Sequence, residues 1–116
     1  MGDVIVGRAL AYMKSNYMEK ISIGDLEGVS GVSRFALSRA FRRHLGVPPI
    51  SWLWAYRVEV AAGLLGHEPH WSCSAIAYQC GFESPAHFSR KFSIHFGRPP
   101  GLYRLARGDL PAAECL

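Results

Sequence analysis

The chain contains nearly the same twelve residues twice, and this repeat constrains the fold more than any other feature. Residues 38–49 read SRAFRRHLGVPP and residues 89–100 read SRKFSIHFGRPP, 51 positions further on. Eight residues recur at this offset, namely Ser33, Ser38, Arg39, Phe41, His44, Gly46, Pro48 and Pro49, which return as Ser84, Ser89, Arg90, Phe92, His95, Gly97, Pro99 and Pro100. Such self-similarity is typical of a structural unit that occurs twice.

A short apolar segment and a glycine precede each copy. SIGDLEGV leads to Gly31, and SCSAIAYQ leads to Gly81, at an offset of 50, so the second turn is one residue longer. Ser33 and Ser84 are placed to cap the helix that follows, and Pro85 favours a first helical position. Each half therefore predicts a short helix, a turn and a second helix, which is a helix-turn-helix pattern.

Helical periodicity runs through the rest of the chain, and no alternating strand pattern competes with it. Ile5, Ala9 and Met13 line one side of a first helix. A central helix over about 49–65 is predicted by apolar residues at helical spacing, with Pro48 and Pro49 at its start and Gly66 at its end. Arg57 falls on the same stripe.

These patterns predict an all-α fold in which two helix-turn-helix subdomains are joined by a long central helix. The expected division is 1–47 for the N-terminal helix and first motif, 48–66 for the linker helix, 67–108 for the second motif and 109–116 for a disordered tail. At about 1.5 Å per residue the linker helix is about 25 Å long. Successive major grooves lie about 34 Å apart on one side of B-DNA, so two recognition helices could enter adjacent grooves from one chain.

Positive charge is concentrated in the first half of this arrangement. The chain has 13 Lys and Arg against 9 Asp and Glu, and residues 33–58 contain five arginines and no acidic residue. In the second helix of each motif, Leu37 and Phe41, or Phe88 and Phe92, must face the core, so Arg39 and Arg90 project elsewhere. Arginine matches guanine O6 and N7 with two hydrogen bonds, which favours DNA reading in the major groove.

The segment AIAYQCGFESPAHFSRKFSIHFGRPPGLYR resembles the signature of AraC/XylS-type transcriptional regulators, and residues 5–104 resemble their whole DNA-binding domain. The resemblance implies seven helices of homeodomain-like type. It also implies monomeric binding to an asymmetric site in double-stranded DNA, and action on transcription through RNA polymerase. The implied base contacts are Phe35, Ser38, Arg39, Ala86, His87, Ser89 and Arg90. The implied phosphate contacts are Arg34, Arg42, Arg43, Arg57 and Lys91.

Glu27 departs from the family pattern, which has a small residue between the helices of the first motif. The second motif keeps Ala77 at the matching place. A buried unpaired carboxylate would be costly. Either Glu27 turns towards solvent and a nearby arginine, or the first motif is distorted and reads DNA poorly. The second case would favour an alternative function, a protein-interaction adaptor or anti-activator on the same fold with weak or lost DNA reading. The modest net charge of +4 also allows this alternative.

Other classes of function have weaker support. His67, His70 and Cys73 have spacing that suggests a metal site, but Pro69 interrupts them and no fourth ligand follows, so no metal or other cofactor is expected. No nucleophile is paired with a base, which argues against an enzyme. Three cysteines without a C-x-x-C pair predict free thiols in a reducing compartment. With no secretory signal or membrane span in view, the expected location is the cytoplasm, on the nucleoid.

Overall fold

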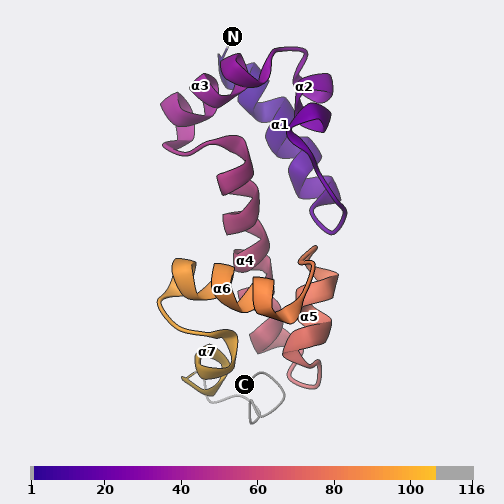
Figure 1. Ribbon diagram of the computed structural model, residues 1–116, viewed down its shortest axis with the longest axis vertical. Coiled ribbons are helices and arrows are strands. Elements are labelled where there is room, and N and C mark those ends of the chain that lie inside the picture. Colours follow the sequence, from indigo (N-terminus) through magenta and orange to yellow (C-terminus); the bar gives the residue numbers. More distant parts are fainter. Residues whose placement is uncertain (1, 107–116) are drawn as a thin grey trace. The chain divides into compact units, whose positions relative to one another are not determined.

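The computed structural model describes residues 2–106, and seven α-helices and no strand occur in that range. The helices are α1 (Gly2–Asn16), α2 (Ile23–Ser30), α3 (Arg34–Leu45), α4 (Pro49–His67), α5 (Cys73–Gln79), α6 (Pro85–Phe96) and α7 (Pro100–Ala106) (Figure 1). The predicted all-α class is confirmed. The chain forms two compact units, one ending at Trp54 and the other starting at Ala55, so α4 contributes residues to both.

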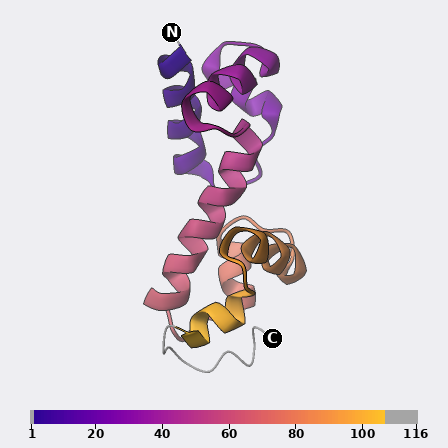
Figure 2. The same cartoon turned by 90° about the vertical axis from the view of Figure 1, so that its left-hand side faces the viewer.

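The first unit is built from α1, α2, α3 and the first residues of α4. In Figure 2, α1 runs along one side of this unit beside α2 and α3, which it contacts. Its apolar stripe meets theirs in one core, whose buried members are Val6, Ala9, Met13, Leu26, Leu37, Ala40, Phe41 and Leu53. Burying a side chain such as Leu37 or Phe41 contributes about 1.5–3 kcal/mol, so this core fixes which sides of α2 and α3 remain exposed.

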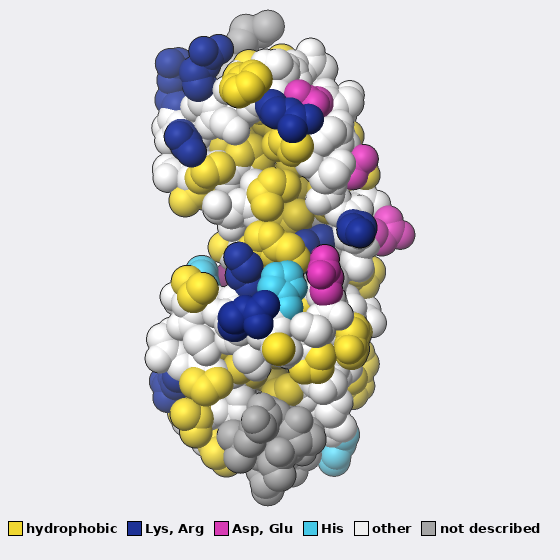
Figure 3. Space-filling model, in the orientation of Figure 1, with side chains coloured by type: hydrophobic (Ala, Val, Ile, Leu, Met, Phe, Trp, Pro, Cys, Tyr) yellow, Lys and Arg dark blue, Asp and Glu magenta, His cyan; other side chains and the backbone are white. Residues whose placement is uncertain are grey.

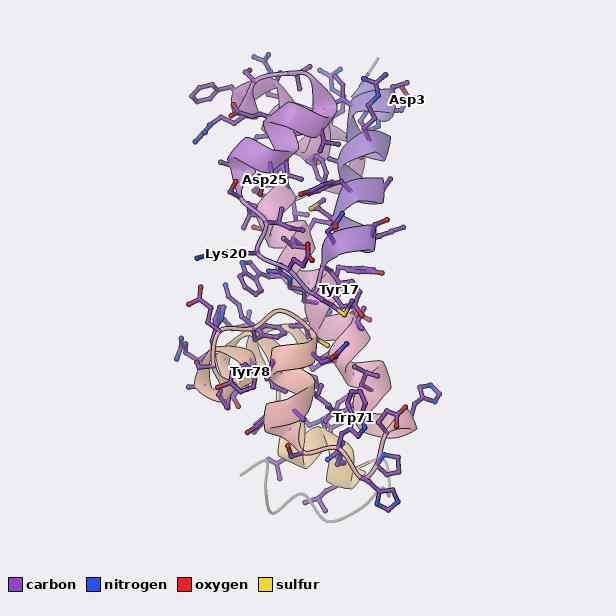
Figure 4. The ribbon with its side chains drawn as sticks, turned by 90° about the vertical axis from the view of Figure 1, so that its right-hand side faces the viewer. Asp3, Tyr17, Lys20, Asp25, Trp71 and Tyr78 are labelled. Atoms are coloured by element: carbon purple, nitrogen blue, oxygen red, sulfur yellow. The ribbon has the colours of Figure 1, made fainter. Side chains whose placement is uncertain are left out.

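Local signals define the ends of α2. Ser22 and Asp25 form a capping box, in which the Ser22 hydroxyl accepts from the Asp25 N–H and the Asp25 carboxylate accepts from the Ser22 N–H. Figure 4 labels Asp25 in this first turn. At the other end Gly31 has a φ of 77°, a left-handed conformation that favours glycine, and its N–H donates to the Glu27 carbonyl. The turn between α2 and α3 therefore depends on Gly31.

The second unit packs α5, α6 and α7 with the rest of α4. Its core contains a series of aromatic rings, in which Phe88 lies 5.0 Å from Phe82 and 5.5 Å from Phe92 between ring centroids. Phe92 continues the series to Tyr103 of α7, at 5.2 Å. Edge-to-face and tilted ring pairs at such distances add about 0.5–1.5 kcal/mol beyond area burial. The series holds α6 against α7 and leaves the other side of α6 exposed.

The central helix ends later than the sequence predicts. Gly66 is not among the glycines with positive φ, so it stays in the helix, which continues to His67. The cysteine prediction is partly wrong, because Cys80 is a buried free thiol but Cys73 is disulfide-bonded. Cys115 and the predicted tail of 109–116 lie outside the described residues.

Candidate nucleic-acid interface

Helix α3 is capped at both ends, and one of its sides is buried. The Ser33 hydroxyl accepts from the Ala36 N–H at 3.2 Å, and Gly46, with a φ of 79°, ends the helix. Because Leu37 and Phe41 are buried, the opposite side is left to solvent. That side carries a surface hollow of about 400 Å³, lined by Phe35, Ser38, Arg39 and Arg42.

Three of the predicted base-contacting residues therefore lie together on the outer side of α3. The Phe35 side chain is 75% exposed, which is unusual for a phenylalanine and leaves its ring available to a ligand. Arg39 is exposed and Ser38 is half-buried. The side chains of this group offer an apolar ring, a hydroxyl and a guanidinium.

The exposed surface of α3 is strongly basic. Arg34, Arg39, Arg42 and Arg43 are all exposed, and the helix contains no acidic residue. Figure 3 shows Lys and Arg side chains gathered over α3 in the first unit and over α6 in the second. Arg42 and Arg43 lie in the last turn, where cations also interact favourably with the helix dipole.

Glu27 of α2 reaches the start of α3 and forms an ion pair there with Arg34. Its carboxylate accepts from the Arg34 backbone N–H at 2.7 Å and from the Arg34 guanidinium at 3.3 Å and 3.2 Å. These hydrogen bonds, the side-chain one foremost, lower the pKa of Glu27 below its usual range. Of the two alternatives raised by this residue, the turn towards a nearby arginine is the one observed.

Helix α6 repeats the design of α3. The Ser84 hydroxyl accepts from the His87 N–H at 3.1 Å, Pro85 occupies the first turn, and Gly97 has a φ of 79°. With Phe88 and Phe92 buried, Ala86 and Arg90 are exposed. The other predicted contacts on this helix, His87, Ser89 and Lys91, are half-buried. Arg90 thus has the same register and exposure as Arg39.

The environment of His87 favours its neutral form. Burial lowers the pKa of this imidazole, and nearby Lys91, Arg90 and Arg57 lower it further, while Glu83 acts in the opposite direction. The ring also packs edge-on against Phe82, with centroids 5.6 Å apart. A neutral imidazole has one donor and one acceptor nitrogen, so it suits a base edge better than a phosphate.

Arg57 is not part of the exposed basic surface. Its side chain is only 3% exposed, and burial lowers the pKa of its guanidinium. It lies near Cys80, whose thiol pKa is raised by burial to about 11. The periodicity had placed Arg57 on the apolar stripe of the central helix, and that position accounts for its burial. A phosphate could reach it only after rearrangement of the core.

Three features of the site region were not predicted from the sequence. Ile94 on α6 is 81% exposed, at the place that matches Arg43 in the repeat. His95 at the end of α6 pairs with Glu59 of α4, at 2.5 Å between Nε2 and Oε2. Arg104 is fully buried. The sequence signal for Ile94 was available, since an isoleucine replaced an arginine at a repeat position.

The structure adds nothing in favour of a metal site. Among residues 2–106 no three His, Cys, Asp or Glu side chains are grouped so that they could hold a metal ion. His67 and His70 are exposed, whereas Cys73 is buried. Within the same range no helix is long and apolar enough to cross a bilayer.

A helical domain with two capped, basic second helices in matching register belongs to the helix-turn-helix class. A family model described as "Helix-turn-helix domain" matches residues 28–106. A putative AraC-like transcription regulator of Streptomyces lividans is 31% identical over 104 residues, which is 90% of this chain and 34% of that protein.

Solved structures agree with this match. The crystal structure of an AraC-type transcriptional regulator from Chromobacterium violaceum has a TM-score of 0.81 and 33% identity, over 89% of this chain and 91% of the other. The DNA-binding domain of AdpA, a global transcriptional factor solved in complex with a target DNA, has a TM-score of 0.81 and 30% identity, over 87% and 90% of the two chains.

The chain belongs to the AraC-type helix-turn-helix family of transcriptional regulators. The matched relatives are regulators rather than enzymes, in agreement with the prediction that this chain is not an enzyme. The chain spans between 32% and 39% of the length of several curated relatives.

Proposed function

We propose that this chain binds double-stranded DNA sequence-specifically, with α3 and α6 as its two recognition helices. The observation that carries the proposal is the match between Arg39 and Arg90. Both arginines are exposed, both lie between two buried apolar positions of a helix capped at each end, and both have the same register in the repeat. A guanidinium held on a fixed helix is suited to bidentate hydrogen bonding with guanine.

The neighbouring side chains suggest a division of roles. Phe35 and Ala86, which match in the repeat, are apolar and suited to thymine methyl groups. Ser38, Ser89 and His87 supply hydrogen bonds to base edges. Exposed Arg42 and Arg43, together with Lys91, are suited to phosphates, which anchor the helix but carry little sequence information. The buried Arg57 is left out of the proposed contacts, and Arg34 is considered separately below.

At the level of the whole site, the two motifs of 1–47 and 67–108, joined through 48–66, would read adjacent major grooves of an asymmetric promoter. One chain would suffice, because it carries both recognition helices, so binding as a monomer is expected. The complex would act on transcription through RNA polymerase, in the cytoplasm and on the nucleoid, where the DNA is. The relative solved with its target DNA supports the choice of ligand.

Binding to a labelled duplex across a range of salt concentrations tests this function. Arg39→Ala and Arg90→Ala should each lose about 1–3 kcal/mol on the preferred sequence and relax selectivity at one base pair. Arg43→Ala should instead weaken all sequences alike and reduce the log-log salt slope by about 0.9. Uniform losses from Arg39→Ala and Arg90→Ala would show that these arginines anchor the protein rather than read bases.

The alternative, a protein-interaction adaptor on the same fold, makes the opposite prediction. An adaptor would not bind duplex DNA, or would bind it without salt dependence. Its main support from the sequence was the possible distortion around Glu27. The ion pair with Arg34 accounts for that carboxylate within a regular helix-turn-helix, so the distortion is not needed.

A further inference from the structure

The Glu27 carboxylate accepts hydrogen bonds from both the backbone N–H and the guanidinium of Arg34, the first residue of α3. One carboxylate oxygen accepts from the Arg34 backbone N–H, which is the first N–H of the helix and has no partner inside it. Both oxygens also accept from the Arg34 guanidinium, so the side chain is held at two points. The two side chains are 30% and 51% exposed, which places the pair at the surface of the first motif.

The second motif has no such ion pair at the start of its second helix, because neither of the matching residues is charged. At the matching places it has Ala77, which is fully buried, and Pro85, which has no backbone N–H to satisfy. The two motifs therefore differ at two matching positions. The first motif has Glu27 and Arg34 where the second has Ala77 and Pro85. Capping alone does not require a guanidinium, so the Arg34 side chain calls for a separate explanation.

Arg34 is placed to contact a phosphate if it were released. It is exposed in the first turn of α3, next to Phe35 and on the helix that carries Arg39. A phosphate and the Glu27 carboxylate would compete for the same guanidinium, since either anion matches its forked donors.

We propose that Glu27 limits sequence-independent DNA binding by the first motif, because it holds Arg34 in an ion pair and so removes one phosphate contact. The inference rests on the proposed function. It predicts that α3 makes one phosphate contact fewer than its number of exposed arginines suggests, so that base contacts contribute a larger share of the binding free energy. Arg34 is then a positioning residue for the helix rather than a DNA contact.

Glu27→Gln is the variant that separates capping from charge. The glutamine amide oxygen can still accept from the Arg34 backbone N–H, so α3 should keep its start, while the ion pair is lost. Binding of wild type and variant to a nonspecific duplex would be measured between 50 and 200 mM salt. One added phosphate contact should steepen the slope by about 0.9, so the advantage of the variant should shrink about 3.5-fold over this range.

Two controls assign the effect to Arg34. Glu83→Gln removes one exposed carboxylate just before α6, and it should leave the slope unchanged. Glu27→Gln combined with Arg34→Gln should gain nothing over Arg34→Gln alone. The double variant Glu27→Ala with Arg34→Pro copies the second motif. It should fold with its helix content intact and have the wild-type slope.

The outcomes are distinguishable. Salt-dependent binding by the wild type, with a steeper slope for Glu27→Gln only when Arg34 is present, supports the inference. If the wild type binds and its slope equals that of Glu27→Gln, the inference is overturned while the proposed function stays in place. Arg34 would then contact a phosphate in both proteins or in neither. Absence of wild-type binding overturns both.

Discussion

Arg104 is a fully buried charged residue whose role in the second unit is structural. Its Nε donates to the Leu65 carbonyl at 3.2 Å and one terminal nitrogen donates to the Glu68 carbonyl at 3.3 Å. Leu65 lies in the last turn of α4, whose carbonyls have no partner within the helix, and Glu68 follows the helix directly, with a carbonyl that also accepts from the Trp71 N–H at 3.1 Å. The helix dipole also favours a cation at this end. Arg104 therefore joins α7 to the end of α4.

Replacing this side chain should be costly. Arg104→Met keeps the apolar bulk but removes the donor from the Leu65 carbonyl, and leaving such a buried acceptor unsatisfied costs about 1–3 kcal/mol. The Glu68 carbonyl keeps its hydrogen bond from the Trp71 N–H. We expect the free energy of unfolding to fall by about 1–3 kcal/mol in urea denaturation. Arg98→Ala, a change at an exposed arginine just before α7, should stay within about 0.5 kcal/mol of wild type. Equal effects of the two changes would contradict the role given to Arg104.

The lowered pKa of Glu27 makes a separate prediction about acid. Because the pKa of this carboxyl is lower in the folded chain than in the unfolded chain, the unfolded chain takes up the proton first as the pH falls. The contribution of the carboxylate to stability is therefore full above the unfolded pKa of about 4.5. That contribution is lost as the pH falls further, through the folded pKa. Melting temperatures of wild type and Glu27→Gln should therefore differ at pH 7 and converge towards pH 3. A difference independent of pH would argue against the ion pair.

At the scale of elements, two glycines of the first motif have opposite roles although they are three residues apart. Gly28 lies within α2, where an added Cβ would have room, whereas Gly31 has a φ of 77° and forms the turn. Glycine weakens a helix interior, but it is the residue that adopts the left-handed conformation without cost.

Alanine at the two positions should thus change stability in opposite directions. Gly28→Ala should stabilise the chain by about 0.5–1 kcal/mol, through helix propensity. Gly31→Ala should destabilise it by about 1–2 kcal/mol, because its Cβ meets the following carbonyl in the left-handed region. Thermal unfolding followed by circular dichroism would measure both. If Gly31→Ala were neutral, the turn would not depend on this conformation.

Helices whose caps and apolar spacing lie within a few residues could be predicted from the sequence. Features that depend on contacts between different helices could not. The caps at Ser33 and Ser84 and the apolar spacing of α3 and α6 require only residues within a few positions. The end of α4 was placed too early, because a glycine such as Gly66 can continue a helix as well as end it. The contact of Glu27 with Arg34 spans seven residues and a turn, so the sequence offered only alternatives.

At the scale of the whole molecule, the repeat was sufficient to predict the two motifs and the class of the fold. It gave exposed Arg39 and Arg90 correctly, since each lies between two apolar positions. It did not separate Arg57 from the other arginines, because a stripe of helical spacing does not reveal how deeply one member is buried. The resemblance placed Arg57 with the phosphate contacts, and its 3% exposure sets it apart from the exposed arginines of α3.

The central claim, that Arg39 and Arg90 read bases in two separate parts of one DNA site, is tested most directly by selecting bound sequences from a random duplex pool. The wild type should enrich an asymmetric site with two informative segments, about 10–10.5 base pairs apart from centre to centre. Arg39→Ala should lose information in one segment, and Arg90→Ala in the other. An unchanged site in both variants, or no enriched sequence with the wild type, would contradict the claim.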